Sequence, residues 1–234
     1  MSLSPATLGV LSDAPLQSCF VNDLGNGYQV IAAHKLAQKK HAVVCLVTAL
    51  VCGAAFAEPS NQSLVASALE RTTHVVRYDG SYYAIPYPGG DVPDNVGVCT
   101  DVVIRAYRAL GIDLQQLVHE DMSENFDLYP SGRIWGLTRP DSNIDHRRVP
   151  NLQVFFERHG EELPISGDAE AFLPGDIVTW MLPGNLPHIG IVTDKINPST
   201  KNRMIVHNIG QGPKLEDMLF DHQITGHYRY VVED

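Results

Sequence analysis

The sequence is poor in cysteine and in positive charge. Its 234 residues include four cysteines, and 17 basic residues stand against 27 acidic ones, giving a net charge of −10. An acidic surface gains nothing by meeting a polyanion, which argues against binding to nucleic acid or to an anionic membrane. Internal repeats, low-complexity tracts and long linkers are also missing from the sequence. The length therefore predicts one domain, or at most two.

Apolar runs long enough to cross a membrane are missing as well, and the longest apolar run that is present is informative. Residues 42–56 form an uncharged apolar run of fifteen residues that directly follows a cluster of lysines. A small-x-small pattern ending at Ala57 closes the run, as is typical of a signal peptide, whereas a membrane-spanning helix needs about 20 residues. We therefore predict a signal peptide over residues 35–57, export to the periplasm or beyond the cell, and a single domain over residues 58–234 without stable membrane insertion.

Other interpretations of the N-terminus stay open. The apolar run could be a buried core helix, or Cys52 could mark a lipoprotein signal, although the preceding Val51 is bulky for that cleavage. Residues 1–34 are a doubtful N-terminal extension, which an incorrectly assigned start would explain. We draw no fold inference from them.

Cys99 is the only cysteine left after cleavage of the leader. Removing the three basic and two acidic residues that precede Glu58 leaves 14 basic and 25 acidic residues, a net charge of −11. An oxidising compartment usually pairs cysteines, and a lone one has no partner in its own chain. We therefore predict that Cys99 is a catalytic nucleophile. A buried inert thiol and an intermolecular disulfide are the alternatives.

Hydrophobic periodicity divides the exported domain into a helical half and a strand-rich half. The pattern predicts helices over residues 63–73, 98–110, 113–125 and 150–158. It predicts strands over residues 176–181, 188–194, 203–209 and 227–232. Residues 78–97, rich in Tyr, Pro and Gly, are expected to form a shaped loop at a cleft. This order predicts an α+β fold in which helices precede an antiparallel meander.

Cys99 falls in the first turn of its predicted helix. There the unpaired N–H groups and the positive end of the helix dipole favour a thiolate, and such thiols can have a pKa of roughly 3.5 to 7.5. Val102 and Val103 mark the face of the predicted helix that we expect to be buried, and Cys99 lies on that same face. Asp101 projects to the other side, where an acid in the first turn is favoured by the dipole.

A thiol nucleophile needs a neighbouring base, and His188 is the best candidate. It begins a predicted strand after a turn, and Gly190 beside it leaves room for a helix to approach closely. If residues 195–202 form the tip of a hairpin, the numbers of facing residues sum to about 396. His188 then faces His207, Asn208 or their neighbour, and either polar residue could orient the imidazole. Taken alone, His188 could also be an ordinary structural histidine.

Four short motifs resemble the NlpC-type branch of the papain-like cysteine peptidases. They are Gly97-Val-Cys-Thr-Asp101, Pro174-Gly-Asp-Ile-Val-Thr-Trp180, His188-Ile-Gly-Ile-Val192 and Ile205-Val-His-Asn208. The resemblance implies a papain-like fold in which the nucleophile helix packs on an antiparallel sheet. It implies Cys99 as nucleophile, His188 as base and His207 as orienting residue, with Asn208 in reserve.

The exported domain also resembles, more specifically, the bacterial family of domain of unknown function 1287. The further motifs are Asn143-Ile-Asp-His-Arg-Arg148, His207-Asn-Ile-Gly210 and Gly226-His-Tyr-Arg229. This resemblance implies export and a papain-like site.

Several residues are candidates for substrate binding. Adjacent Arg147 and Arg148 could hold a substrate carboxylate, although a solvated loop with local ion pairs is the alternative. Tyr83 and Tyr87 could line the cleft or pack beneath the loop. Asp101 is included as a candidate, with the first-turn acid as its alternative.

Together these features predict an exported cysteine hydrolase that cleaves amide bonds, with peptidoglycan stem peptides as substrate and no cofactor. The alternative is a catalytically inactive module that binds the cell wall or a partner on the same fold. A metal held by His188, His207 and an acid such as Asp176 is a third possibility, which the absence of a His-x-x-x-His pair disfavours.

Overall fold

The computed structural model describes residues 60–230. The predicted signal peptide, residues 35–57, and the doubtful extension, residues 1–34, lie outside the described residues. Among residues 60–230, no helix combines the length and the apolar composition needed to cross a membrane.

Four helices form where the sequence predicted them, with ends that differ by at most two residues. They are α1 (Asn61–Arg71), α2 (Cys99–Arg108), α3 (Leu114–Asn125) and α5 (Val149–His159). Side-chain caps fix two of the starts: the Ser60 hydroxyl accepts from the Ser63 N–H group, and Asp113 accepts from the Gln115 N–H group. Such caps satisfy N–H groups that have no partner within the helix.

Shorter helical segments went unpredicted. These are α4 (Ser131–Trp135) and the 3-10 turns η1 (Phe126–Leu128), η2 (Asp145–Arg147) and η3 (Ala169–Ala171). Helix α4 ends at Gly136, whose left-handed φ of 67° suits glycine. Segments of three to five residues are too short to show a helical period, which explains why the pattern missed them.

The main sheet is antiparallel and has the strand order β3-β8-β4-β5-β6-β7. Its strands are β3 (Glu161–Glu162), β4 (Ile177–Leu182), β5 (Leu186–Ile196), β6 (Arg203–His207), β7 (Lys214–Glu216) and β8 (Gln223–Arg229). The predicted meander holds for β4, β5 and β6. The unpredicted strand β7 extends it, whereas the predicted last strand, β8, returns across the sheet to pair with β4. A separate parallel pair joins β1 (Arg77–Tyr78) to β2 (Val96–Gly97).

The β5–β6 hairpin has the predicted register. Ile191 pairs with Val206 and Val192 with Ile205, so the numbers of facing residues sum to 397. The expected role of Gly190 was wrong, however. A Cβ atom there would meet Ile205 Cγ2 at 2.7 Å and the Val206 carbonyl oxygen at 3.0 Å. Gly190 therefore makes room for the neighbouring strand β6, and not for a helix.

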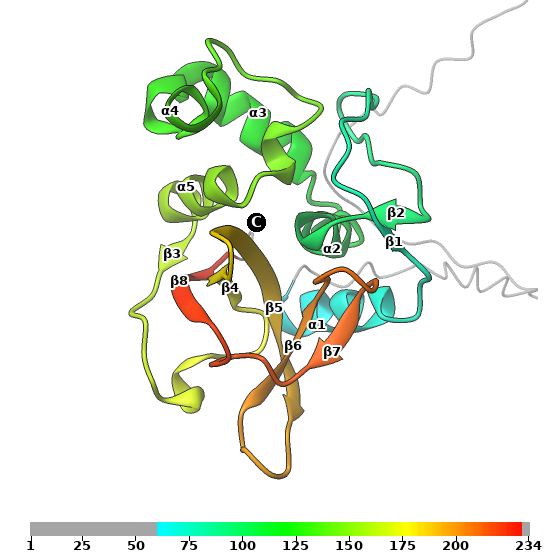
Figure 1. Cartoon of the computed structure of the whole chain (residues 1–234), viewed down its shortest axis with the longest axis vertical. Coiled ribbons are helices and arrows are strands. Elements are labelled where there is room, and N and C mark those ends of the chain that lie inside the picture. The colour runs from blue at the N-terminus through cyan, green and yellow to red at the C-terminus, as the bar shows by residue number, and fades with distance from the viewer. Residues whose placement is uncertain (1–59, 231–234) are drawn as a thin grey trace, which may run out of the picture. The chain divides into compact units, whose positions relative to one another are not determined.

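Strand β5 separates two apolar cores. Ile189 and Ile191 pack in the core that contains α2, whereas Val192 packs with Trp180 and Phe172 in the other. In Figure 1, α1 and α2 lie against the sheet beside β5, while α3 and α5 lie together at the top of the view. The predicted α+β fold, with the Cys99 helix packed on an antiparallel sheet, is confirmed.

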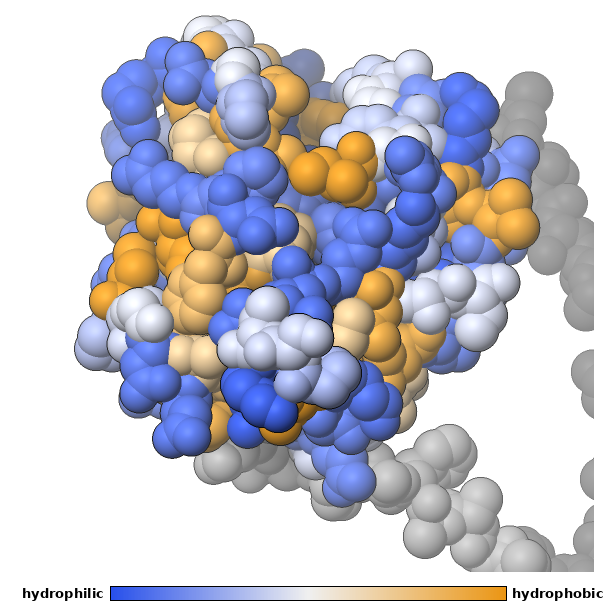
Figure 2. Space-filling model, turned by 60° about the horizontal axis from the view of Figure 1, so that its bottom comes forward, coloured by the Kyte–Doolittle hydropathy of each residue, from blue (hydrophilic) through white to orange (hydrophobic). Residues whose placement is uncertain are grey.

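The surface is mixed in character. On the face drawn in Figure 2, hydrophobic residues form several separate patches between hydrophilic ones. Isolated apolar residues of this kind are ordinary on a protein surface.

Candidate active site

Helix α2 begins at Cys99, as the sequence predicted, and a buried ion pair holds its first turn in place. Asp101 accepts a hydrogen bond from the Val98 N–H group at 2.6 Å. The same carboxylate receives two hydrogen bonds from Arg147, at 2.9 and 3.0 Å, and both side chains are almost fully buried. A bidentate pair of this kind is directional as well as strong. It fixes the start of α2 and hence the position of the thiol.

The Cys99 thiol is protonated in this setting. Only 4% of the residue is exposed, and burial raises the pKa of the thiol to about 12, although the nearby backbone N–H group of Ile189 lowers it. The expected depressed pKa was therefore wrong, because desolvation outweighs the helix start. A buried thiol needs a base at the moment of reaction.

His188 lies next to Ile189 on β5, opposite Trp180 of β4. Its Nε2 atom is 3.0 Å from Nδ1 of His207 on β6. Burial, together with the charges of His207 and His222, lowers the pKa of His188 to about 3, so the imidazole is neutral near pH 7. Within residues 60–230, Nδ1 of His188 makes no hydrogen bond, and none joins this ring to Cys99.

Glu216 extends this row beyond the residues that the sequence identified. Its Oε2 atom lies 3.0 Å from Nε2 of His207, and its side chain is 44% exposed. Burial lowers the pKa of His207, although the Glu216 carboxylate raises it. Glu216 lies on β7, a strand of three residues that the periodicity did not reveal.

The hydrogen-bond partners assign the protons along this row. An ionised carboxylate can only accept, so Nε2 of His207 carries a proton and its Nδ1 atom is an acceptor. His188 must then donate from Nε2 to His207, which leaves Nδ1 of His188 with a free lone pair. The row Glu216–His207–His188 thus presents one unprotonated nitrogen of a neutral imidazole.

Asn208, the other candidate for the orienting residue, lies elsewhere. Its side-chain oxygen accepts from the Gly210 N–H group at 3.1 Å, and its amide nitrogen lies 3.5 Å from the Gly97 carbonyl oxygen. These contacts hold the turn after β6 and the strand before α2. Of the two candidates, His207 alone contacts His188 among the described residues.

A cleft of about 300 Å³ opens at Cys99. Its walls include Tyr78, Trp135, Arg148 and Pro187. The Arg148 guanidinium lies 4.0 Å from the centre of the Trp135 ring and donates to Asp145 at 3.1 Å. Stacking of this kind holds the cation in place while leaving N–H groups for a ligand. Arg148 therefore lies in the wall of the Cys99 cleft, and its role in substrate binding stays a prediction.

Tyr78 is a cleft residue that the sequence analysis missed. Burial raises the pKa of its phenol to about 12, as does its nearness to Cys99 and Asp101, so the hydroxyl keeps its proton near neutral pH. Its position at the start of the Tyr-rich loop was the available signal, but several tyrosines share that loop.

The other residues predicted to bind substrate have structural contacts instead. Arg147 binds Asp101 and also donates to the Ser81 carbonyl oxygen at 3.2 Å. The Tyr83 hydroxyl donates to Asp79 at 3.0 Å. Asp101 and Tyr83 do not line the Cys99 cleft. Arg147 does line it, but Asp101 holds the guanidinium of Arg147. We therefore remove Arg147, Asp101 and Tyr83 from the substrate-binding set.

Tyr87 leaves the set as well. Its ring packs edge-on against His119, with the ring centres 4.9 Å apart, and it does not line the Cys99 cleft. The residue is 42% exposed, so it is not packed beneath the loop either.

The acid suggested for a metal site is also engaged elsewhere. Asp176 contacts Nε2 of His227 at 2.8 Å and accepts from Nε of Arg229 at 2.8 Å. Across residues 60–230, no three His, Cys, Asp or Glu side chains gather in a way that could hold a metal ion.

Comparison with known proteins places the chain in a family. The profile of domain of unknown function 1287 matches residues 65–230. The chain belongs to this family. A curated relative of this DUF1287 protein is the uncharacterized protein YijF of Escherichia coli (strain K12), which is 48% identical over 174 residues, or 74% of this chain and 83% of the relative.

Solved structures similar to this DUF1287 protein include NlpC1 and NlpC2 from Trichomonas vaginalis. Their TM-scores are 0.41 and 0.40, each at 16% identity and over 75% and 76% of this chain. The matches cover 45% and 50% of those chains, so this chain spans about half of their length. At these scores the likeness carries no argument about activity.

Proposed function

We propose that this protein is an exported cysteine hydrolase that cleaves amide bonds in peptides of the cell wall. The observation that carries the proposal is the row Glu216–His207–His188, which leaves a free imidazole nitrogen beside the strand residue that Cys99 contacts. A neutral imidazole can take the proton of a thiol as a general base, and the approach of His188 to the Cys99 thiol is part of this proposal.

The reaction has two covalent steps. Nδ1 of His188 takes the thiol proton while the Cys99 sulfur attacks the carbonyl carbon, and the imidazolium then protonates the departing nitrogen as the C–N bond breaks. A water molecule next attacks the thioester, His188 accepts its proton, and the acid product leaves as the proton returns to sulfur. His207 and Glu216 stabilise the imidazolium that forms in both steps.

When the sulfur attacks, the carbonyl oxygen of the substrate becomes a negatively charged oxyanion, which needs hydrogen-bond donors to stabilise it. The backbone N–H group of Cys99 is at the first position of α2, where it has no partner within the helix. The Tyr78 hydroxyl lines the same cleft and remains protonated. We assign the stabilisation of this oxyanion to these two groups.

The substrate class follows from the cleft and from the predicted leader. Arg148 presents a cation at the cleft wall in a protein that is acidic as a whole, which favours a peptide that carries a carboxylate. Export, predicted from residues 35–57, would place the enzyme where peptidoglycan stem peptides are found. Periplasmic or secreted localisation is part of this proposal.

The test is incubation of the purified protein with soluble peptidoglycan fragments, followed by mass spectrometry of the products. We expect cleavage at an amide bond with the uptake of one water molecule. We expect Cys99→Ala to abolish this cleavage without a change in circular dichroism. Products formed equally by the Cys99→Ala variant would overturn the proposal.

A binding module without catalytic activity is the second candidate function. The raised pKa of Cys99 and the missing hydrogen bond to His188 within the described residues favour it. Retention of the folded protein on peptidoglycan, together with no cleavage products, would establish this alternative.

A further inference from the structure

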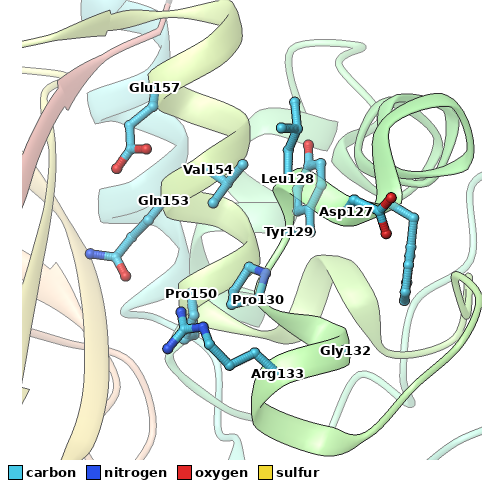
Figure 3. Close-up of a pocket in the computed structure, with 11 residues that line it drawn as sticks. Asp127, Leu128, Tyr129, Pro130, Gly132, Arg133, Pro150, Gln153, Val154 and Glu157 are labelled. Carbon is cyan, nitrogen blue, oxygen red and sulfur yellow. The ribbon is translucent and has the colours of Figure 1, made fainter.

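A second cavity adjoins the Cys99 cleft. It has a volume of about 480 Å³ and lies between α4 and α5 (Figure 3). Pro150, at the start of α5, lines both this cavity and the cleft. The shared wall at Pro150 makes the two cavities neighbours.

One side of this cavity carries a row of polar groups. Figure 3 shows the Arg133 guanidinium next to Pro150, the Gln153 amide beyond it and the Glu157 carboxylate at the far end, all on one side. Pro150, Gln153 and Glu157 are three or four residues apart on α5 and therefore share one helix face. The row runs from a cation to an anion.

Hydrogen bonds hold two side chains of this row, Gln153 and Glu157, in place. Gln153 donates to the Thr179 hydroxyl at 3.0 Å, and Glu157 accepts from the Tyr228 hydroxyl at 3.3 Å. Burial raises the pKa of Glu157, although the hydrogen bond from Tyr228 lowers it. An ammonium beside this carboxylate would favour its charged form. Arg133, by contrast, makes no hydrogen bond or ion pair with any residue in 60–230, and its side chain is exposed.

Apolar side chains also line the cavity, among them Leu128, Pro130 and Val154, and Asp127 contributes a second carboxylate opposite the row. An apolar floor with a few fixed polar groups is the usual construction of a small-ligand site. Aliphatic carbon atoms between two charged ends would contact this floor.

We propose that this cavity is a second subsite of the Cys99 cleft and binds a zwitterionic amino-acid group, with the carboxylate at Arg133 and the ammonium at Glu157. The role as part of a substrate site rests on the proposed hydrolase function. Binding of the zwitterion itself does not depend on that function, which allows the two ideas to be tested separately.

The binding test uses full-length Cys99→Ala protein and three matched probes. N-α-acetyl-lysine carries a carboxylate and an ammonium, N-α-acetyl-lysine amide lacks the carboxylate, and N-α,N-ε-diacetyl-lysine lacks the ammonium. Dissociation constants are measured from NMR shifts of the backbone amides of residues 151–157. We expect the zwitterion to bind at least fivefold more tightly than either analogue. Equal affinity for the three probes, or no shift at saturating concentration, would overturn the proposal.

Variants of the cavity supply the controls. We expect Arg133→Ala and Glu157→Gln each to weaken binding of N-α-acetyl-lysine at least fivefold. Arg139→Ala removes another exposed arginine that lines a different cavity, and Glu124→Gln neutralises an exposed carboxylate on α3 that does not line this cavity. Both should leave the affinity unchanged. Equal weakening by target and control variants would overturn the assignment.

The link to the substrate is tested with the active protein. We expect Arg133→Ala to raise KM for a wall peptide severalfold with kcat unchanged, which indicates lost ground-state binding. An unchanged KM, in a protein whose cavity binds the zwitterion, would overturn the subsite role. Absence of all turnover with intact probe binding would refute the hydrolase proposal and its subsite role, but not the zwitterion site.

Discussion

Neutralising Glu216 tests how the proton positions in the histidine row are set. In Glu216→Gln the side chain keeps its size, but its amide can donate to His207 Nε2 and so permits the opposite tautomer of both rings. Nδ1 of His188 would then carry a proton and could not act as the base. The variant separates the charge and hydrogen-bond polarity of Glu216 from its packing.

The size of the effect follows from the exposure of the carboxylate. A hydrogen bond to a charged group contributes about 1.5–3 kcal/mol, and water screens part of it because the Glu216 side chain is 44% exposed. We therefore expect a loss of about 1–2 kcal/mol of transition-state stabilisation. This corresponds to a kcat/KM that is roughly 5- to 30-fold lower.

The assay compares kcat/KM of four proteins on one amide substrate. Glu216→Gln and Glu216→Ala should both show the loss, whereas Glu162→Gln should not. Glu162 lies on β3, at the opposite edge of the same sheet, and provides the same change in charge. A Glu216→Gln variant as active as the wild type, or an equal loss in Glu162→Gln, would refute the assignment of the tautomers.

Two further predictions concern the thiol and the ion pair beneath it. Because the pKa of Cys99 is raised to about 12, the fraction of thiolate should increase about tenfold per pH unit below that value. The rate of alkylation by iodoacetamide should therefore rise steadily from pH 7 to 10. A rate that is already constant near pH 7 would contradict a buried, protonated thiol. Asp101→Asn leaves Arg147 buried without its charged partner and should lower the free energy of unfolding, measured in urea, by about 3–5 kcal/mol. The control Arg77→Ala removes one member of an exposed ion pair and should change this free energy by less than about 1 kcal/mol. Equal losses in the two variants would contradict a structural role for Asp101.

The parts of the site that the sequence predicted depend on regular spacing. The helical period placed Cys99 in the first turn of α2, and the strand period with the length of the hairpin tip placed His207, Asn208 or their neighbour opposite His188. These rules describe neighbours along one helix or across one hairpin. Residues joined in that way could be predicted without the structure.

The missed parts depend on contacts between distant segments. Adjacent Arg147 and Arg148 looked equivalent in the sequence, but η2 turns one toward Asp101 and the other onto Trp135 of α4. The pairing of β8 with β4 is likewise a long-range contact. The raised pKa of Cys99 is a consequence of burial, which the position in the helix did not reveal.

The account depends most on Cys99 as the nucleophile that His188 activates. The most direct measurement compares cleavage of peptidoglycan fragments by the wild type, Cys99→Ala and His188→Ala, with products identified by mass spectrometry and folding checked by circular dichroism. The account predicts amide cleavage by the wild type alone. Cleavage by folded Cys99→Ala protein at the wild-type rate would contradict it.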